Sequence, residues 1–246
     1  MLLGIAIVIT AAIAGIAATN VSLRYFLQPT GALIVLGGTL GIAFVTTPGT
    51  SLLHSAKRVT ELLWKPRESR EALIEEIMTY VRAARINGLL SIEPMAAQAS
   101  NAFLREALLL TVDAKERTEL QAALEIKLRL RERQGESDAK ALEVAGGFAP
   151  TLGVLGTVVG LIDVLRQFSN VSSVAYGIGT AFVSTIYGLG LANLALLPAA
   201  HRIRASVAET FEMHELMMEG ALCLFDKAHP SLVRERLNSF LREAAR

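Results

Sequence analysis

The residues best suited to chemistry lie inside two apolar stretches of the chain. Thr157, Ser184 and Thr185 place three hydroxyls among small and apolar side chains, and Pro150 and Pro198 interrupt the same stretches. Hydroxyl oxygens can replace part of the water shell of a small cation. A proline leaves one backbone carbonyl without its usual donor, which is tolerable at membrane depth only beside protein or water. Together these residues indicate the wall of a packed, partly hydrated helix bundle that transports an ion.

These stretches contain almost no acidic side chains. A transporter that carries ions on its own residues holds a carboxylate near the middle of the membrane. Asp163 is the only acidic residue here, and it lies near the end of its stretch, three residues before Arg166. A locally paired interfacial charge explains Asp163 better than an ion relay does. The sequence therefore predicts that these stretches do not supply the ion-binding charge themselves and that something else must supply it.

Helix packing is a second reading of the small residues. Ser184, Gly188 and Ala192 recur every four residues and form one face, through which helices can pack closely without any ion. Packing alone explains Gly188 and Ala192. It explains the hydroxyls of Thr157, Ser184 and Thr185 less well, although membrane Ser and Thr often bond only to their own helix. Packing and ion passage are compatible, and both stay open here.

Other kinds of chemistry find no support in the sequence. It contains no phosphate-binding glycine loop, zinc-ligand spacing or nucleophile elbow, so we expect neither an enzyme nor a cofactor nor a metal site. The single cysteine, Cys223, cannot form an internal disulfide, and the four histidines are scattered. The formal net charge is +1, and Lys and Arg alternate with Asp and Glu, which argues against a nucleic-acid partner.

Four charge-free stretches must position the hydroxyls and the prolines. Each is long enough to hold the roughly 20 apolar residues of a membrane span; they cover 1–23, 25–53, 144–162 and 167–200. No Lys or Arg precedes the first, and further spans follow it, so we expect a retained helix rather than a cleaved signal peptide. The mean hydropathy of the chain, +0.44, agrees with a multi-pass protein surrounded by membrane lipid.

The basic residues predict the topology. Only Arg24 and Arg166 lie in or beside the two short loops, and all others fall in 54–143 or 201–246. Because Lys and Arg near the membrane favour the cytoplasmic side, both termini and the long loop are expected in the cytoplasm.

The cytoplasmic segments have helical patterns. An amphipathic helix is expected over 69–86, ended by Asn87-Gly88, and a second from the capping-box-like Asp113–Glu116 to about Arg133. A last helix begins at Pro230 and ends near Ala245. The predicted fold is all-α: membrane helices 1 and 2 in 1–50, a cytoplasmic helical domain in 51–143, membrane helices 3 and 4 in 144–200, and a cytoplasmic tail in 201–246.

Three segments resemble one family, the MotA/PomA stator proteins of the bacterial flagellar motor, which belong to the MotA/TolQ/ExbB proton channels. Ala149–Gly160 resembles their third membrane helix and Ser184–Pro198 their fourth. Arg85–Glu93 is similar to their rotor-facing region. The resemblance implies a five-subunit ring in the inner membrane, around a dimer of a single-span MotB-like partner whose aspartate carries the ion. Ion flow would then produce torque on the flagellar rotor.

The resemblance also implies roles for individual residues. By position, Pro150 and Pro198 match the prolines tied to torque generation, and Thr157, Ser184 and Thr185 match residues beside the ion path. Arg85 and Glu93 match the charges that contact the rotor. Some members carry additional charges where this chain has Ile86 and Pro94, so the contact rests on fewer charges or on others such as Arg82.

The transported ion and the class of motor have alternatives. Sodium-type members tend to carry Thr at the position of Ser184 and proton-type members Gly or Ala, so serine stands between them. The family as a whole favours protons, which we therefore expect, with sodium as the alternative. An ExbB/TolQ-type subunit energising outer-membrane processes is the nearest other function. A membrane scaffold without ion flux is the alternative from a different class.

Overall fold

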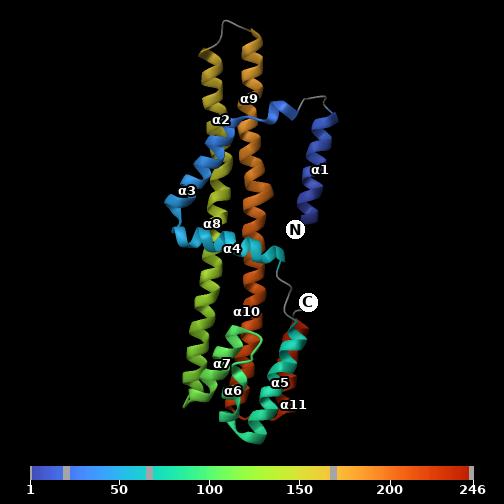
Figure 1. Cartoon of the computed structure of the whole chain (residues 1–246), viewed down its shortest axis with the longest axis vertical. Coiled ribbons are helices and arrows are strands. Elements are labelled where there is room, and N and C mark those ends of the chain that lie inside the picture. Colours follow the sequence, from blue (N-terminus) through green and yellow to red (C-terminus); the bar gives the residue numbers. More distant parts are fainter. Residues whose placement is uncertain (1, 19–22, 65–68, 167–170, 244–246) are drawn as a thin grey trace. The chain divides into compact units, whose positions relative to one another are not determined.

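The computed structural model describes residues 2–18, 23–64, 69–166 and 171–243, and within them every regular element is a helix (Figure 1). The chain divides into two compact units. Unit 1 comprises Met1–Leu63 and Ser137–Arg204, and unit 2 comprises Trp64–Glu136 and Ala205–Arg246. The two longest helices, α8 and α10, contribute to both units.

Unit 1 contains the apolar helices. In chain order its elements are α1 (Leu2–Ala18), the 3-10 turn η1 (Leu23–Phe26), α2 (Pro29–Ala32), the π-helical η2 (Leu33–Gly37), α3 (Gly38–Thr46), α4 (Gly49–Trp64), the second part of α8 (Arg117–Arg166), α9 (Val171–Gly190), the π-helical η4 (Leu191–Leu196) and the start of α10 (Leu197–Phe225). Three described helical stretches are long and apolar enough to cross a membrane: Pro29–Thr46, Arg117–Arg166 and Gly177–Phe225. A shorter apolar helix, Ala6–Gly15, lies within α1.

Helix α8 corrects two sequence-based expectations. Asp113 does not open a helix but is the last residue of α7 (Ala102–Asp113), and α8 begins at Arg117. The helix also does not end near Arg133 but continues as one 50-residue helix to Arg166. Gly135 lies inside this helix and is closely packed, since a Cβ there would collide with the side chain of Val207. This glycine permits a close helix contact rather than a helix end.

Unit 2 is a small helical domain with its own core. Its helices are α5 (Arg70–Asn87), the 3-10 turn η3 (Leu89–Ile92), α6 (Glu93–Ala96), α7, the first part of α8, the second part of α10 and α11 (Pro230–Glu243). The expected signals for α5 are confirmed, since Ser69 Oγ accepts from the N–H of Ala72 at 3.3 Å and Gly88 ends the helix with φ +84°. Pro230 opens α11 as predicted.

The core of unit 2 contains one buried histidine. The His214 ring stacks on Phe103 with 4.3 Å between ring centroids, and the guanidinium of Arg131 lies 5.1 Å from the centroid of Phe103. Burial, and secondly the charge of Arg131, lower the pKa of His214 to about 4. The imidazole is therefore neutral near pH 7, which allows it to pack as a core side chain.

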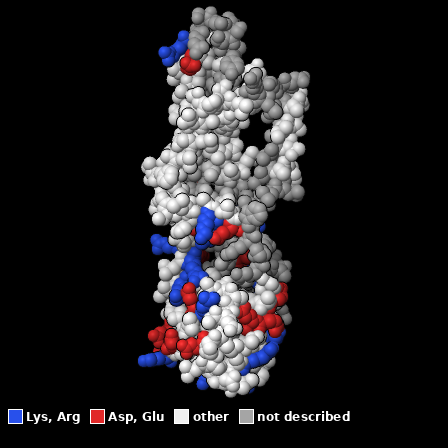
Figure 2. All heavy atoms as spheres, in the orientation of Figure 1, with Lys and Arg blue, Asp and Glu red and all other residues white. Residues whose placement is uncertain are grey.

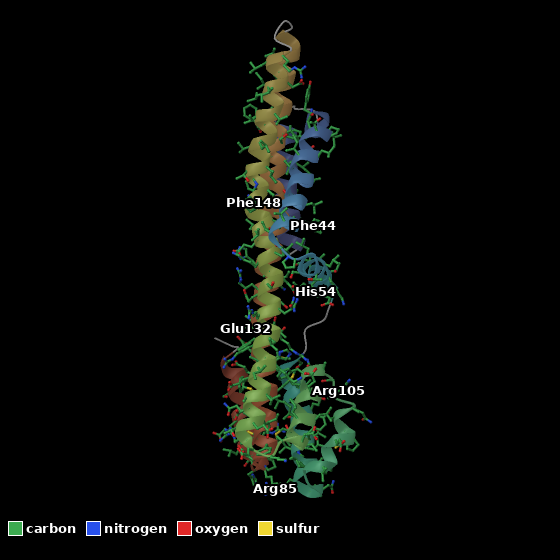
Figure 3. The ribbon with its side chains drawn as sticks, turned by 90° about the vertical axis from the view of Figure 1, so that its left-hand side faces the viewer. Phe44, His54, Arg85, Arg105, Glu132 and Phe148 are labelled. Carbon is green, nitrogen blue, oxygen red and sulfur yellow. The ribbon has the colours of Figure 1, made fainter. Side chains whose placement is uncertain are left out.

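Charge separates the surfaces of the two units. On the face shown in Figure 2, the apolar stretches of unit 1 are almost free of charged residues apart from a small cluster at one end, whereas acidic and basic side chains are spread over unit 2. Unit 1 also contains charged residues outside these stretches, among them Arg58, Asp138 and Arg204. Large apolar side chains such as Phe44 and Phe148 lie on the outside of unit 1 (Figure 3). An apolar exterior suits lipid or further protein, and a charged one suits water.

Candidate functional site

Helices α8 and α9 approach so closely that their backbones touch. A Cβ on Gly153 would lie 3.0 Å from the carbonyl oxygen of Ser184, and one on Gly160 would lie 2.9 Å from Cβ of Ala181. At Gly188 the added atom would lie 2.5 Å from the carbonyl oxygen of Ala149. The small residues of the two helices therefore form a glycine seam, as the packing interpretation predicted.

Two of the three predicted hydroxyls meet in this seam. The Oγ1 atoms of Thr157 and Thr185 are 2.6 Å apart, and Thr157 Oγ1 also lies 3.0 Å from the carbonyl oxygen of Ala181 and 3.2 Å from that of Gly153. Each hydroxyl has one hydrogen. If Thr157 donates to one of the two carbonyls, Thr185 donates to Thr157. Both side chains are half-buried, so the pair can still be reached from outside the protomer.

The third hydroxyl, that of Ser184, lies elsewhere. Its side chain is only 3% exposed. A Cβ on Gly31 of α2 would collide with Ser184 Oγ, and a Cβ on Gly156 of α8 would lie 2.8 Å from Ser184 Cβ. Ser184 thus packs between α2 and α8 inside the protomer. The structure brings Thr157 and Thr185 together and does not bring Ser184 to them.

The two predicted prolines flank one helix contact. Pro150 lies half-buried inside α8, and because it has no N–H, the carbonyl of Gly146 loses its usual helical donor. A Cβ on Gly146 would lie 2.8 Å from the side chain of Leu197, the residue before Pro198. Each proline therefore lies within about one helical turn of the contact between α8 and α10.

The π-helical stretch η4 ends two residues before Pro198. A proline ring crowds the carbonyl four residues earlier, here that of Leu194, and a π-helical turn relieves the crowding. The side-chain amide of Asn193 donates to the carbonyl of Leu189 at 3.0 Å. This hydrogen bond gives the Leu189 carbonyl a donor where the regular backbone hydrogen bonds of the helix are interrupted, as a membrane helix requires.

A tyrosine that sequence reasoning did not select holds the start of α2. Tyr187 OH accepts from the backbone N–H of Gln28 at 3.1 Å and donates to the backbone carbonyl of Phe26. These groups lie between η1 and α2, where no helical partner is available. The two partners of the Tyr187 hydroxyl are about 160 residues away from it in sequence, so no local pattern reveals them. The contact positions α2, and hence Gly31, against Ser184.

We expect Tyr187→Phe to destabilise the protein, because one substitution leaves a donor and an acceptor unsatisfied at membrane depth, at a cost of about 1–3 kcal/mol for each. The thermal midpoint of the protein purified in mild detergent would fall. Gln28→Ala is the matched control, since it removes a side chain but keeps the N–H that binds Tyr187. Equal midpoints for Tyr187→Phe and the native chain would show that the hydroxyl does not hold α2.

A buried ion pair anchors α4 to α8. Arg58 Nε lies 2.7 Å from Oδ2 of Asp138, whose side chain is 1% exposed, and Ser55 Oγ donates to the carbonyl of Asp138 at 2.8 Å. Glu143 of α8 also pairs with Arg204 of α10 at 3.2 Å. In the sequence these charges resemble ordinary solvated residues, so the anchor was not predicted.

The predicted rotor-contact charges lie in unit 2. Arg85 is in the last turn of α5 and Glu93 is the first residue of α6, and both side chains are exposed. Asp163 is exposed in the last turn of α8. Among the described residues, no group of three or more His, Cys, Asp or Glu side chains could hold a metal ion.

Comparisons with known proteins agree on one family. Residues 95–216 match the MotA/TolQ/ExbB proton channel family. The chain is 27% identical to Motility protein A of Bacillus subtilis (strain 168) over 244 residues, which cover 98% of this chain and 89% of that protein. It is 26% identical to Chemotaxis protein PomA of Vibrio alginolyticus over 225 residues, covering 92% and 88%.

Solved structures extend the similarity to the fold. A chain of the C. jejuni MotAB structure matches with a TM-score of 0.90 at 23% identity, covering 97% of this chain and 94% of that chain. A chain of the flagellar MotAB stator complex from Bacillus subtilis matches with a TM-score of 0.88 at 26% identity, covering 98% and 95%. Both similarities include residues of unit 1 and of unit 2.

Proposed function

Because the chain belongs to the MotA/TolQ/ExbB proton channel family, as its sequence predicted, we propose that it is an ion-conducting stator subunit of the bacterial flagellar motor. That family consists of ion channels and stators, not enzymes. The ion passes beside α8 and α9, and a MotB-like single-span partner supplies the aspartate that carries it. The observation that carries this proposal is the Thr157–Thr185 hydroxyl pair, set in a seam that offers no carboxylate of its own.

Complementation tests this function. A motile bacterium whose stator genes have been deleted would receive this chain together with a MotB-like partner. We expect swimming to return, and to be lost again when the membrane aspartate of the partner becomes asparagine. A pair that conducts ions but never restores swimming would favour an ExbB/TolQ-type motor, and a pair that conducts no ions would favour a scaffold.

The membrane arrangement follows from the apolar helices. The protein is an inner-membrane protein of the family, and we propose four spans with both termini in the cytoplasm. In this arrangement α1 and Pro29–Thr46 are the first two spans, and the apolar parts of α8 and α9–α10 are the other two. The clustering of charge on unit 2 supports a cytoplasmic position for that unit (Figure 2).

A ring of five copies around two partner chains is the assembly we propose. Within the protomer, a Cβ on Gly37 or Gly41 would meet no atom within 4 Å, although both glycines lie on apolar helices. Phe44 and Val45 nearby are strongly exposed. Small and apolar surfaces left open in one protomer support packing against further helices.

Protons are the ion that we propose. Sodium requires several hard oxygens at one place. The Thr157 and Thr185 hydroxyls converge but already bond to each other and to a carbonyl, and Ser184 contributes no oxygen to this pair. A proton needs only the partner's carboxylate and intermittent water, which the half-buried pair can support.

We therefore expect swimming speed to be independent of external sodium at constant pH. The measurement is the speed of complemented cells while sodium is replaced by potassium at constant ionic strength. A speed proportional to sodium would overturn the choice of ion but not the stator function. In that case Ser184→Ala would identify whether this position determines the dependence.

Rotor contact is proposed for Arg85 and Glu93. Arg85→Glu should lower torque only partly, by roughly twofold to fivefold, because single exposed charge contacts contribute little. Ion leak and membrane level should stay unchanged. Arg105→Glu is the matched control, since Arg105 is another exposed arginine of unit 2 (Figure 3). An equal loss in both variants, or a parallel fall in membrane level, would assign Arg85 a structural role.

A further inference from the structure

Two large apolar side chains are exposed where α5 ends and η3 begins. Ile86 is 80% exposed and Leu90 is 74% exposed, the two highest values among the large hydrophobic residues in the described part of unit 2. Single exposed apolar residues are common on protein surfaces. Two within one short segment, the end of α5 and the start of η3, indicate a contact surface because both are so strongly exposed.

The exposure is not a consequence of a loose turn. Gly88 adopts φ +84° and donates its N–H to the carbonyl of Ala84 at 2.9 Å, and Ser91 Oγ donates to the carbonyl of Gly88 at 2.7 Å. Leu89 packs against the core of unit 2, and Ile92 is fully buried. The same turn therefore directs Leu89 and Ile92 inward and holds Leu90 outward. The backbone that carries the outward side chain is fixed before any partner binds, which lowers the entropic cost of contact.

Charged side chains flank the two apolar residues. Arg85, which Figure 3 labels, directly precedes Ile86. Glu93 follows Leu90 by three residues. Neither charge forms an ion pair with another described residue, and both are exposed. An apolar centre with a charged rim is the usual composition of a protein–protein contact.

We propose that Ile86 and Leu90 form the apolar centre of the rotor contact, with Arg85 and Glu93 at its rim. The partner surface is accordingly an apolar protein patch bordered by a carboxylate that faces Arg85 and a cation that faces Glu93. This inference rests on the proposed stator function. It assigns the larger share of binding to the apolar pair, because exposed charge pairs contribute little while buried Ile and Leu side chains contribute more.

The test uses the complemented swimming strain with Ile86→Ser, Leu90→Ser and the double variant. Each single change should lower the affinity for the rotor about tenfold. The double variant should not swim. Leu130→Ser is the matched control, because Leu130 is also an exposed leucine of unit 2, at 61%, on α8. Membrane level, thermal midpoint and ion leak should match the native chain in all variants, since these side chains are largely exposed. A double variant that swims like Leu130→Ser would overturn the proposal.

A photo-crosslinking side chain at position 90 identifies what covers the turn. We expect a covalent product with the rotor protein, detected with an antibody against it, and no such product from position 130. A product with a second copy of this chain would overturn the proposal and make the turn a contact within the ring. Failure of the native pair to restore swimming would instead remove the stator function, and this inference with it.

Discussion

Replacing Pro150 with leucine is expected to abolish swimming while leaving assembly and membrane level unchanged. Proline removes a backbone hydrogen bond from the interior of α8, and leucine would restore the bond to the carbonyl of Gly146. The helix would become stiffer by about 3 kcal/mol against bending at this point. If α8 must bend in each ion cycle, such a penalty slows the step by about a hundredfold.

The measurement compares swimming, torque on a tethered bead and assembly with the partner. Val154→Leu is the control, because Val154 lies one turn further along α8 with an exposed apolar side chain. It should swim normally. Normal swimming by the Pro150→Leu variant would show that α8 does not bend at this site. Loss of assembly would show that the half-buried side chain of Pro150 is needed for packing against α10 rather than for movement.

Local signals explain why much of the fold could be predicted. The start of α5 at Ser69, its end at Gly88 and the start of α11 at Pro230 each depend on backbone requirements of one or two residues. Burial of Gly188 and Ala192 likewise follows from their four-residue spacing. The length of α8 did not follow, because the part beyond Arg133 packs through contacts such as that of Gly135 with Val207, which is distant in sequence.

The candidate site shows the same limit at the level of side chains. Ser184 and Thr185 are adjacent in sequence, yet successive residues of a helix point about 100° apart. Thr185 therefore faces Thr157 while Ser184 faces Gly31. Which of the two faces meets α2 is decided by contacts between distant segments. The hydroxyls could be recognised from sequence, but their grouping could not.

Polar anchors were the least predictable part. Tyr187 holds a backbone turn of a helix far away in the chain, and Arg58 pairs with a buried aspartate, Asp138. Neither pair has a characteristic spacing, and each partner alone resembles a common interfacial tyrosine or a solvated charge. Their importance derives from burial, since a polar group without water must find a partner in the protein.

Gly188→Ala is expected to have the largest structural effect of a single methyl group in this protein. The added Cβ would lie 2.5 Å from the carbonyl oxygen of Ala149 and 3.0 Å from Cα of Gly153. Both neighbours are backbone atoms, so no side-chain rotation can relieve the overlap. Helices α8 and α9 would have to separate, at a cost of about 3 kcal/mol, and the separation would pull Thr185 away from Thr157.

The glycine two residues further along the chain provides a matched comparison. Gly190 lies at the end of α9, and a Cβ there would meet no atom within 4 Å. Gly190→Ala should therefore keep the native thermal midpoint and ion leak, or raise the midpoint slightly through better helix propensity. Gly188→Ala should lower the midpoint and abolish both ion leak and swimming. Equal behaviour of the two variants would mean that α8 and α9 do not need backbone contact, and the hydroxyl pair could not then depend on the glycine seam.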